Sequence, residues 1–241
     1  FKLINKNGNA VEQKMSISVY GANNEILKNK ITSAKIVGGY NDFIVLNADG
    51  KVYGWGYNGS GQLGLGNTSN YTTPVYLNMD NVIDITARGN YTAVLKKDGT
   101  VWMAGYNGNG ELGINGTSSQ SSFVQVKNED GTGFLTNIKD IESGVNTMYA
   151  ITNDGEVYAW GYNGYGQMGF GDTSSRLLPV KLNITNIKQI SAGEHDTIAL
   201  DNNGEVWVAG RNTEGQLGIG NSSDSAVWAK MKSSDGSKAF A

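Results

Sequence analysis

The sequence predicts an all-β fold built from repeated four-stranded antiparallel sheets. Four segments of the 241-residue chain repeat one pattern, and each is marked by a turn glycine: Gly50, Gly99, Gly155 and Gly204. The chain contains 34 glycines but only 2 prolines, which is typical of many tight turns between short strands. No segment shows a convincing helical period. Self-similarity at a spacing of about 50 residues indicates a repeat architecture.

Each repeat is expected to contain four strands in a fixed order. An alternating run predicts one strand, an Asp-Gly or Asn-Gly turn follows, and a run rich in β-branched and aromatic residues predicts the next. A glycine-rich loop and a further strand complete the repeat, and a fourth strand precedes the next hairpin. The hairpin strands are expected at 42–46 and 52–55, 91–95 and 101–104, 147–151 and 157–160, and 196–200 and 206–209. The remaining strands are expected near 75–77, 82–85, 124–126, 138–141, 180–182, 187–190 and 227–231.

A four-stranded sheet of this kind has two apolar faces and cannot bury both alone. Stacking on the next sheet covers them, which predicts the blades of a β-propeller. The blades are expected at about residues 32–79, 80–135, 136–184 and 185–234, followed by a truncated start of a fifth, and an insertion is expected around 128–134. Residues 1–31 lack the loop signature. They are expected to form a partial or degenerate blade with a turn at Asn7-Gly8, a closing strand, or the tail of another domain.

The glycine-rich loop resembles that of the regulator of chromosome condensation repeat family, in its bacterial type. The unit reads Trp-Gly-Tyr-Asn at 55–58 and Gly-Gln-Leu-Gly at 61–64, with variants at 160–163 and 166–169 and at 210–212 and 215–218. The resemblance covers about residues 32–234 and implies a ring of roughly seven blades. Four repeats would then be an incomplete part of such a ring, in a longer natural protein or one that self-associates through its open blade ends.

Composition argues against several classes of function. The formal net charge is −3 and no run of basic residues occurs, which argues against a nucleic-acid partner. Cysteine is absent, so disulfides and thiolate metal sites are excluded, and no stretch of 18 apolar residues predicts membrane insertion. Because the chain opens on Phe1, we expect a mature or excised piece. The cysteine-free, Asn-, Lys- and Ile-rich composition favours a bacterial surface or secreted protein, and a cytoplasmic one stays compatible.

Motifs that could carry chemistry are better explained by structure. Three loops fit G-x-G-x-x-G, but no helix follows any of them, so we expect turns and no cofactor. His195 is the one histidine, and its neighbour Asp196 would point to the opposite face of a strand, so no catalytic residues are expected. The stretch 128–131 lacks the spaced acidic ligands of a calcium loop, so no metal is expected. The sequence therefore predicts that the chain is not an enzyme.

The loop before each alternating strand is the predicted partner-binding site. These loops differ in charge and size between repeats whose scaffold residues agree, and repeat proteins commonly place specificity in such loops. Tyrosine and arginine are favoured at interface hot spots. The predicted contact residues are Tyr40, Asn41, Arg88, Asn90, Tyr91, Asn146, Glu194 and His195. We therefore expect a scaffold that binds another protein. The alternatives are guanine-nucleotide exchange on a small GTPase, a propeller lyase or hydrolase, and a structural part of a phage or surface fibre.

Overall fold

The chain divides into two compact units, Phe1–Ile31 and Thr32–Ala241. The computed structural model describes residues 3–4, 10–11 and 34–233. In the first unit, β1 (Leu3–Ile4) pairs antiparallel with β2 (Ala10–Val11). The expected turn at Asn7-Gly8 and most of the expected fifth-blade start lie outside the described residues.

Each repeat of the second unit forms one four-stranded antiparallel sheet, as the sequence predicted. Blade 1 consists of β3 (Lys35–Gly38), β4 (Asp42–Leu46), β5 (Val52–Gly56) and β6 (Tyr71–Tyr76). Blade 2 consists of β7 (Val82–Ala87), β8 (Tyr91–Lys96), β9 (Val101–Gly105) and β10 (Gln120–Gln125). Blade 3 consists of β11 (Ile138–Ser143), β12 (Thr147–Thr152), β13 (Val157–Gly161) and β14 (Arg176–Lys181). Blade 4 consists of β15 (Ile187–Ala192), β16 (Asp196–Asp201), β17 (Val206–Gly210) and β18 (Ser225–Lys230).

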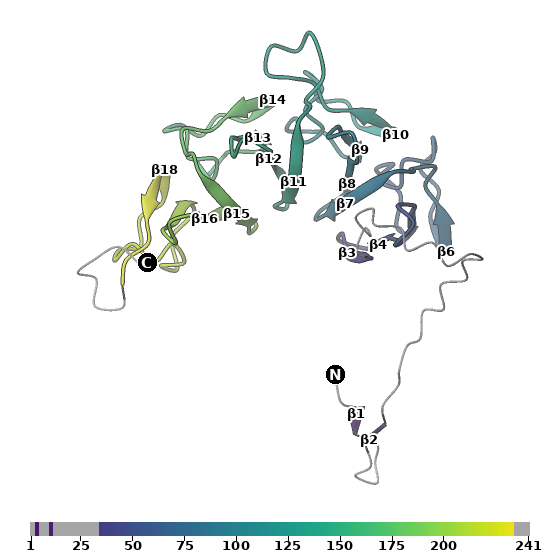
Figure 1. Ribbon diagram of the computed structural model, residues 1–241, viewed down its shortest axis with the longest axis horizontal. Helices are drawn as coiled ribbons and strands as arrows, with labels where there is room; N and C mark the ends of the chain where they lie inside the picture. The colour runs from purple at the N-terminus through teal and green to yellow at the C-terminus, as the bar shows by residue number, and fades with distance from the viewer. Residues whose placement is uncertain (1–2, 5–9, 12–33, 234–241) are drawn as a thin grey trace, which may run out of the picture. The chain divides into compact units, whose positions relative to one another are not determined.

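The four blades stand side by side along an arc within the second unit (Figure 1). The first strand of each blade lies on the inner side of the arc, and the fourth strand lies on the outer side. On the inner side, Lys35 of β3 and Asp84 of β7 join neighbouring blades by an ion pair of 2.6 Å. This arrangement is a β-propeller that comprises four blades in the described residues. Those residues form no helix that is long and apolar enough to span a membrane.

In the described residues, three of the four hydrophobic core clusters lie between neighbouring blades, and the fourth lies within blade 4. The cluster between blades 2 and 3 joins Leu112 and Val126 to Ile141, Met148 and Trp160. Trp160 is fully buried, and its indole N–H donates to the carbonyl of Glu111 in the preceding blade, 2.8 Å away. Removing a buried tryptophan costs about 3–5 kcal/mol, so Trp160 contributes much of the stability of the contact between blades 2 and 3. We call each contact between neighbouring blades a blade seam.

The glycine-rich loops of blades 1 to 3 extend the seam to the outer strand of the next blade. The N–H of Gly66 donates to the carbonyl of Ser121 at 2.7 Å. Corresponding bonds join Asn115 to Leu177 at 3.0 Å and Gly171 to Ala226 at 2.7 Å. The G-x-G-x-x-G loops therefore hold blades together, and in the described residues none of them leads into a helix.

A buried asparagine closes each glycine-rich loop from inside. Its Oδ1 accepts the N–H of the residue five positions later, at 2.8–2.9 Å, in all four blades. The pairs are Asn58 with Leu63, Asn107 with Leu112, Asn163 with Met168, and Asn212 with Leu217. Because each asparagine is fully buried, it fixes the loop without reaching solvent.

Gly61→Ala should damage a blade seam, and Gly215→Ala is its matched control. Both glycines have positive φ, +79° and +75°, which costs an alanine about 1–2 kcal/mol. At Gly61 a Cβ would also lie 2.5 Å from Ser121 Cα, whereas at Gly215 no described atom lies within 4 Å. Overpacking adds about 1–3 kcal/mol at Gly61 alone. Urea unfolding followed by tryptophan fluorescence measures both losses, and equal losses would contradict a seam role for Gly61.

Candidate functional site

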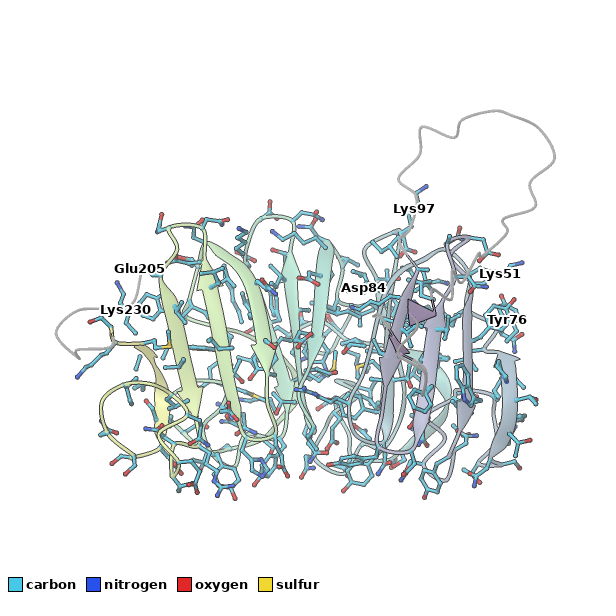
Figure 2. The ribbon with its side chains drawn as sticks, turned by 90° about the horizontal axis from the view of Figure 1, so that it is seen from below. Lys51, Tyr76, Asp84, Lys97, Glu205 and Lys230 are labelled. Carbon is cyan, nitrogen blue, oxygen red and sulfur yellow. The ribbon has the colours of Figure 1, made fainter. Side chains whose placement is uncertain are left out.

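The loops at one end of the blades form the candidate functional surface, which we call the loop face. Because neighbouring strands are antiparallel, the loop after the first strand and the loop after the third strand leave each blade at the same end. The loops after the first strands are 39–41, 88–90, 144–146 and 193–195, and the glycine-rich loops are 57–70, 106–119, 162–175 and 211–224. The opposite end, the turn face, carries Lys51 and Lys97 (Figure 2).

One backbone hydrogen bond joins the two kinds of loop in every blade. The N–H of the first residue in the glycine-rich loop donates to the carbonyl of the last residue in the predicted binding loop. The pairs are Tyr57 with Asn41 at 2.9 Å, Tyr106 with Asn90 at 2.8 Å, Tyr162 with Asn146 at 2.8 Å, and Arg211 with His195 at 2.9 Å. Each predicted loop is therefore held against a tyrosine or arginine that the sequence analysis did not select.

Two of the predicted loops also contact other blades. The N–H of Tyr40 donates to the carbonyl of Gly89 at 3.2 Å. From blade 2, the guanidinium of Arg88 donates to the carbonyl of Ala192 in blade 4. The structure thus brings the variable loops together on one surface.

Seven of the eight predicted contact residues lie exposed or half-buried on the loop face. Tyr40, Asn41, Arg88 and Glu194 are exposed, and Asn90, Asn146 and His195 are half-buried. For Tyr91, the prediction was wrong, because this side chain is fully buried. Its hydroxyl donates to the carbonyl of Gly144 at 2.7 Å, and burial raises its pKa well above the ordinary value. Tyr91 therefore joins blades 2 and 3 and does not reach a partner.

Tyrosines at one repeated position are the residues that the sequence analysis missed. Tyr57 is 40% exposed and Tyr106 is 39% exposed, and both lie on the loop face. Each ring lies over the glycine two residues later, Gly59 or Gly108, where any side chain would overlap the tyrosine. The signal was present in the sequence, since a tyrosine follows glycine at this position in three of the four repeats.

A compact aromatic and charged cluster occupies the loop face of blades 3 and 4. Tyr165 stacks on His195 with 4.2 Å between ring centroids, and Tyr162 lies 6.0 Å from the same imidazole. The guanidinium of Arg211 lies 6.0 Å from the Tyr165 ring, and a Glu194 carboxylate oxygen lies 3.6 Å from His195 Nε2. Nδ1 of His195 is buried and has no hydrogen-bond partner among the described residues. The cluster offers rings and both signs of charge to a partner.

The residues considered for metal binding do not converge in the described part of the chain. No three His, Asp or Glu side chains there lie close enough together to hold a metal ion. In the stretch compared with a calcium loop, Asp130 Oδ1 accepts hydrogen bonds from the N–H and hydroxyl of Thr132, at 2.8 Å and 2.6 Å. This carboxylate therefore stabilises a turn.

The family model of the RCC1-like domain matches residues 6–240, almost the whole chain. The chain belongs to the RCC1-like domain family. This confirms the predicted resemblance to regulator of chromosome condensation repeats.

Two curated relatives of this RCC1-like chain illustrate how far the sequence likeness extends. The ultraviolet-B receptor UVR8 of Arabidopsis thaliana is 31% identical over 134 residues, which cover 55% of the chain and 30% of the relative. The X-linked retinitis pigmentosa GTPase regulator of Canis lupus familiaris is 32% identical over 146 residues, which cover 58% of the chain and 14% of the relative. The matches thus span less than a third of either relative.

Solved structures show the same fold. Yeast RCC1 (Prp20), solved with Kap60, superposes with a TM-score of 0.70 at 22% identity over 83% of this chain and 49% of that chain. Human WBSCR16 gives a TM-score of 0.70 at 23% identity, with 83% and 52% covered. The RCC1-like chain thus matches about half of each of these propellers.

Asp42→Asn should change the pH dependence of stability. Asp42 is 1% exposed beneath the loop face, and burial raises its pKa to about 6, while a hydrogen bond from Gln62 at 3.3 Å lowers it by less. As pH rises from 3.8 to about 6, the Asp42 carboxyl loses its proton in the unfolded state while it keeps it in the folded state. The free energy of unfolding of the wild type therefore falls across that window by up to about 3 kcal/mol. The Asn variant lacks this loss, so relative to wild type it should gain stability between pH 3.5 and pH 7.

Asp98→Asn is the control of opposite sign. Hydrogen bonding from Thr100 lowers the pKa of Asp98, so the ionised form stabilises the folded state. Relative to wild type, this variant should lose stability as pH rises through the acidic range. Urea unfolding at pH 3.5 and pH 7 measures both differences. If the free energies of unfolding of Asp42→Asn and wild type differ by the same amount at both pH values, the pKa of Asp42 is not raised in the folded state.

Proposed function

We propose that the RCC1-like chain is a protein-binding module that recognises a partner through its loop face. The observation that carries this proposal is the set of exposed tyrosines, Tyr40, Tyr57 and Tyr106, on one face of a regular frame. Tyrosine supplies a large amphipathic contact area at a small cost in side-chain entropy, and it is enriched at interface hot spots.

The frame supports this role because it holds the tyrosines in place before a partner arrives. Asn58 and Asn107 are buried beneath the loops that begin with Tyr57 and Tyr106. The backbone bonds to Asn41 and Asn90 fix the same two tyrosines from the other side. A surface whose residues are already ordered loses less entropy on binding, which favours affinity.

Relatives of known structure support a protein partner. Yeast RCC1 was solved bound to Kap60, and the study of Saccharomyces cerevisiae Prp20p reports binding to Gsp1p and histones. By analogy, the loop face of this chain takes a protein as its ligand and performs no catalysis. We also propose, from composition alone, a bacterial surface or secreted location.

Guanine-nucleotide exchange is the second candidate function. A 45-residue stretch is 42% identical to the Ras guanine nucleotide exchange factor C of Dictyostelium discoideum, over 3% of that protein. A fluorescent-nucleotide release assay on a small GTPase separates the two candidates. Acceleration by catalytic amounts of the chain would support exchange, whereas an unchanged rate supports a binding module.

Replacing Tyr57 and Tyr106 together by alanine should abolish most partner binding. A partner identified by co-purification is produced pure, and calorimetry compares its affinity for wild type and variants. Each hot-spot tyrosine contributes about 2 kcal/mol or more, so the double variant should bind about 700-fold more weakly or worse.

Tyr76→Ala is the matched control for this loss. Tyr76 ends β6 near the turn face (Figure 2), so its removal should leave affinity unchanged. If Tyr76→Ala loses binding and the double variant of Tyr57 and Tyr106 binds fully, the binding site does not lie on the loop face.

A further inference from the structure

The second repeat carries an insertion that the other described repeats lack. Its turn glycine and the next one are 56 residues apart, compared with 49 for the flanking pairs. The extra residues lie between β10 and β11, where residues 126–137 connect the blades, whereas residues 77–81 and 182–186 make the corresponding connections. The insertion therefore lies on the turn face, opposite the loop face.

The insertion forms a closed hairpin. Lys127 and Phe134 form a bridge between its two sides, and the N–H of Asn128 donates to the carbonyl of Gly133 at 3.1 Å. The side chain of Asn128 accepts the N–H of Gly133 in return, at 2.9 Å. Leu135, 5% exposed, anchors the hairpin in the cluster between blades 2 and 3. The hairpin is thus preorganised by its own bonds and by the core.

Between this hairpin and blade 3 lies a cavity of about 560 Å³, which we call the insertion pocket. This volume lies within the range of about 300–1,000 Å³ that is usual for ligand sites. Phe134 and Tyr158 contribute aromatic walls, and Phe134 is 54% exposed. The carboxylates that line the pocket belong to Glu129, Asp130 and Glu156.

The charges in the pocket favour a cation. Hydrogen bonding from Thr132 lowers the pKa of Asp130, so this group is ionised at neutral pH. Lys181, which does not line the pocket, forms an ion pair of 2.5 Å with Glu156 and offsets the charge of that carboxylate. No lysine or arginine is among the residues that line the pocket, and Glu129 and Asp130 are exposed on its rim.

We propose that the insertion pocket binds a lysine- or arginine-bearing peptide segment of a protein partner. A long basic side chain would lay its apolar stem against Phe134 and Tyr158 and place its cationic head among the carboxylates. Blade 4 repeats the ion pair, with Glu205 and Lys230 2.6 Å apart (Figure 2), but no insertion precedes it. The site therefore depends on the hairpin and not on an acidic residue alone.

Fluorescence anisotropy tests this proposal with a labelled eight-residue peptide of alternating glycine and arginine or lysine. A peptide with glutamine at every basic position is the reference. We expect the basic peptide to bind wild type and the reference not to bind. Phe134→Ala and the double variant Glu129→Gln with Asp130→Asn should each weaken binding at least tenfold.

Glu205→Gln is the matched control, because it removes one carboxylate from an equivalent ion pair outside the pocket. It should bind the basic peptide as wild type does. Equal weakening by Glu205→Gln would show attraction to overall charge and overturn the proposal, as would no binding of the basic peptide or equal binding of the reference. The Tyr57 and Tyr106 variants should retain peptide binding, which keeps this test independent of the loop face.

Discussion

The fold depends on the approach of the glycine-rich loops of blades 1 to 3 to the outer strand of the next blade. A single sheet leaves an apolar face uncovered, and the seam covers it with a backbone hydrogen bond and a shared hydrophobic cluster. The loop comes so close that Gly61 has no room for a Cβ, and a buried asparagine, Asn58, fixes its curvature. The same two residue types recur in all four repeats, and in blades 1 to 3 the loop makes this contact with the next blade.

The part of the fold that local patterns determine could be predicted from the sequence. The hairpins follow from Asp-Gly and Asn-Gly turns between β-branched runs, and the hairpin strands lie within about one residue of their predicted bounds. The outer strands were harder to place. β6 begins at Tyr71, several residues before the expected 75–77. The prediction missed this start because Thr72 and Thr73 are exposed and give no apolar alternation. The register with β5 also shifts there, so no simple period marks the strand.

The candidate site could be predicted only in part, since side-chain burial depends on neighbouring blades. Tyr91 directly follows a variable loop as the first residue of β8, but blade 3 covers it and accepts its hydroxyl hydrogen bond. Tyr57 and Tyr106 occupy a repeated position and therefore resembled scaffold, although the fold leaves both rings exposed. The insertion pocket forms because a hairpin of blade 2 packs beside blade 3. No sequence motif in either segment predicts that the two lie together.

The bond between Asn41 and Tyr57 uses only main-chain atoms, as do its three counterparts. A substitution at position 41 or 195 can therefore change the side chain at the loop face and keep this main-chain bond. This separation of the loop side chains from the main-chain frame allows the four repeats to carry different loop residues. It also makes these positions suitable for randomisation in an engineered library of binders.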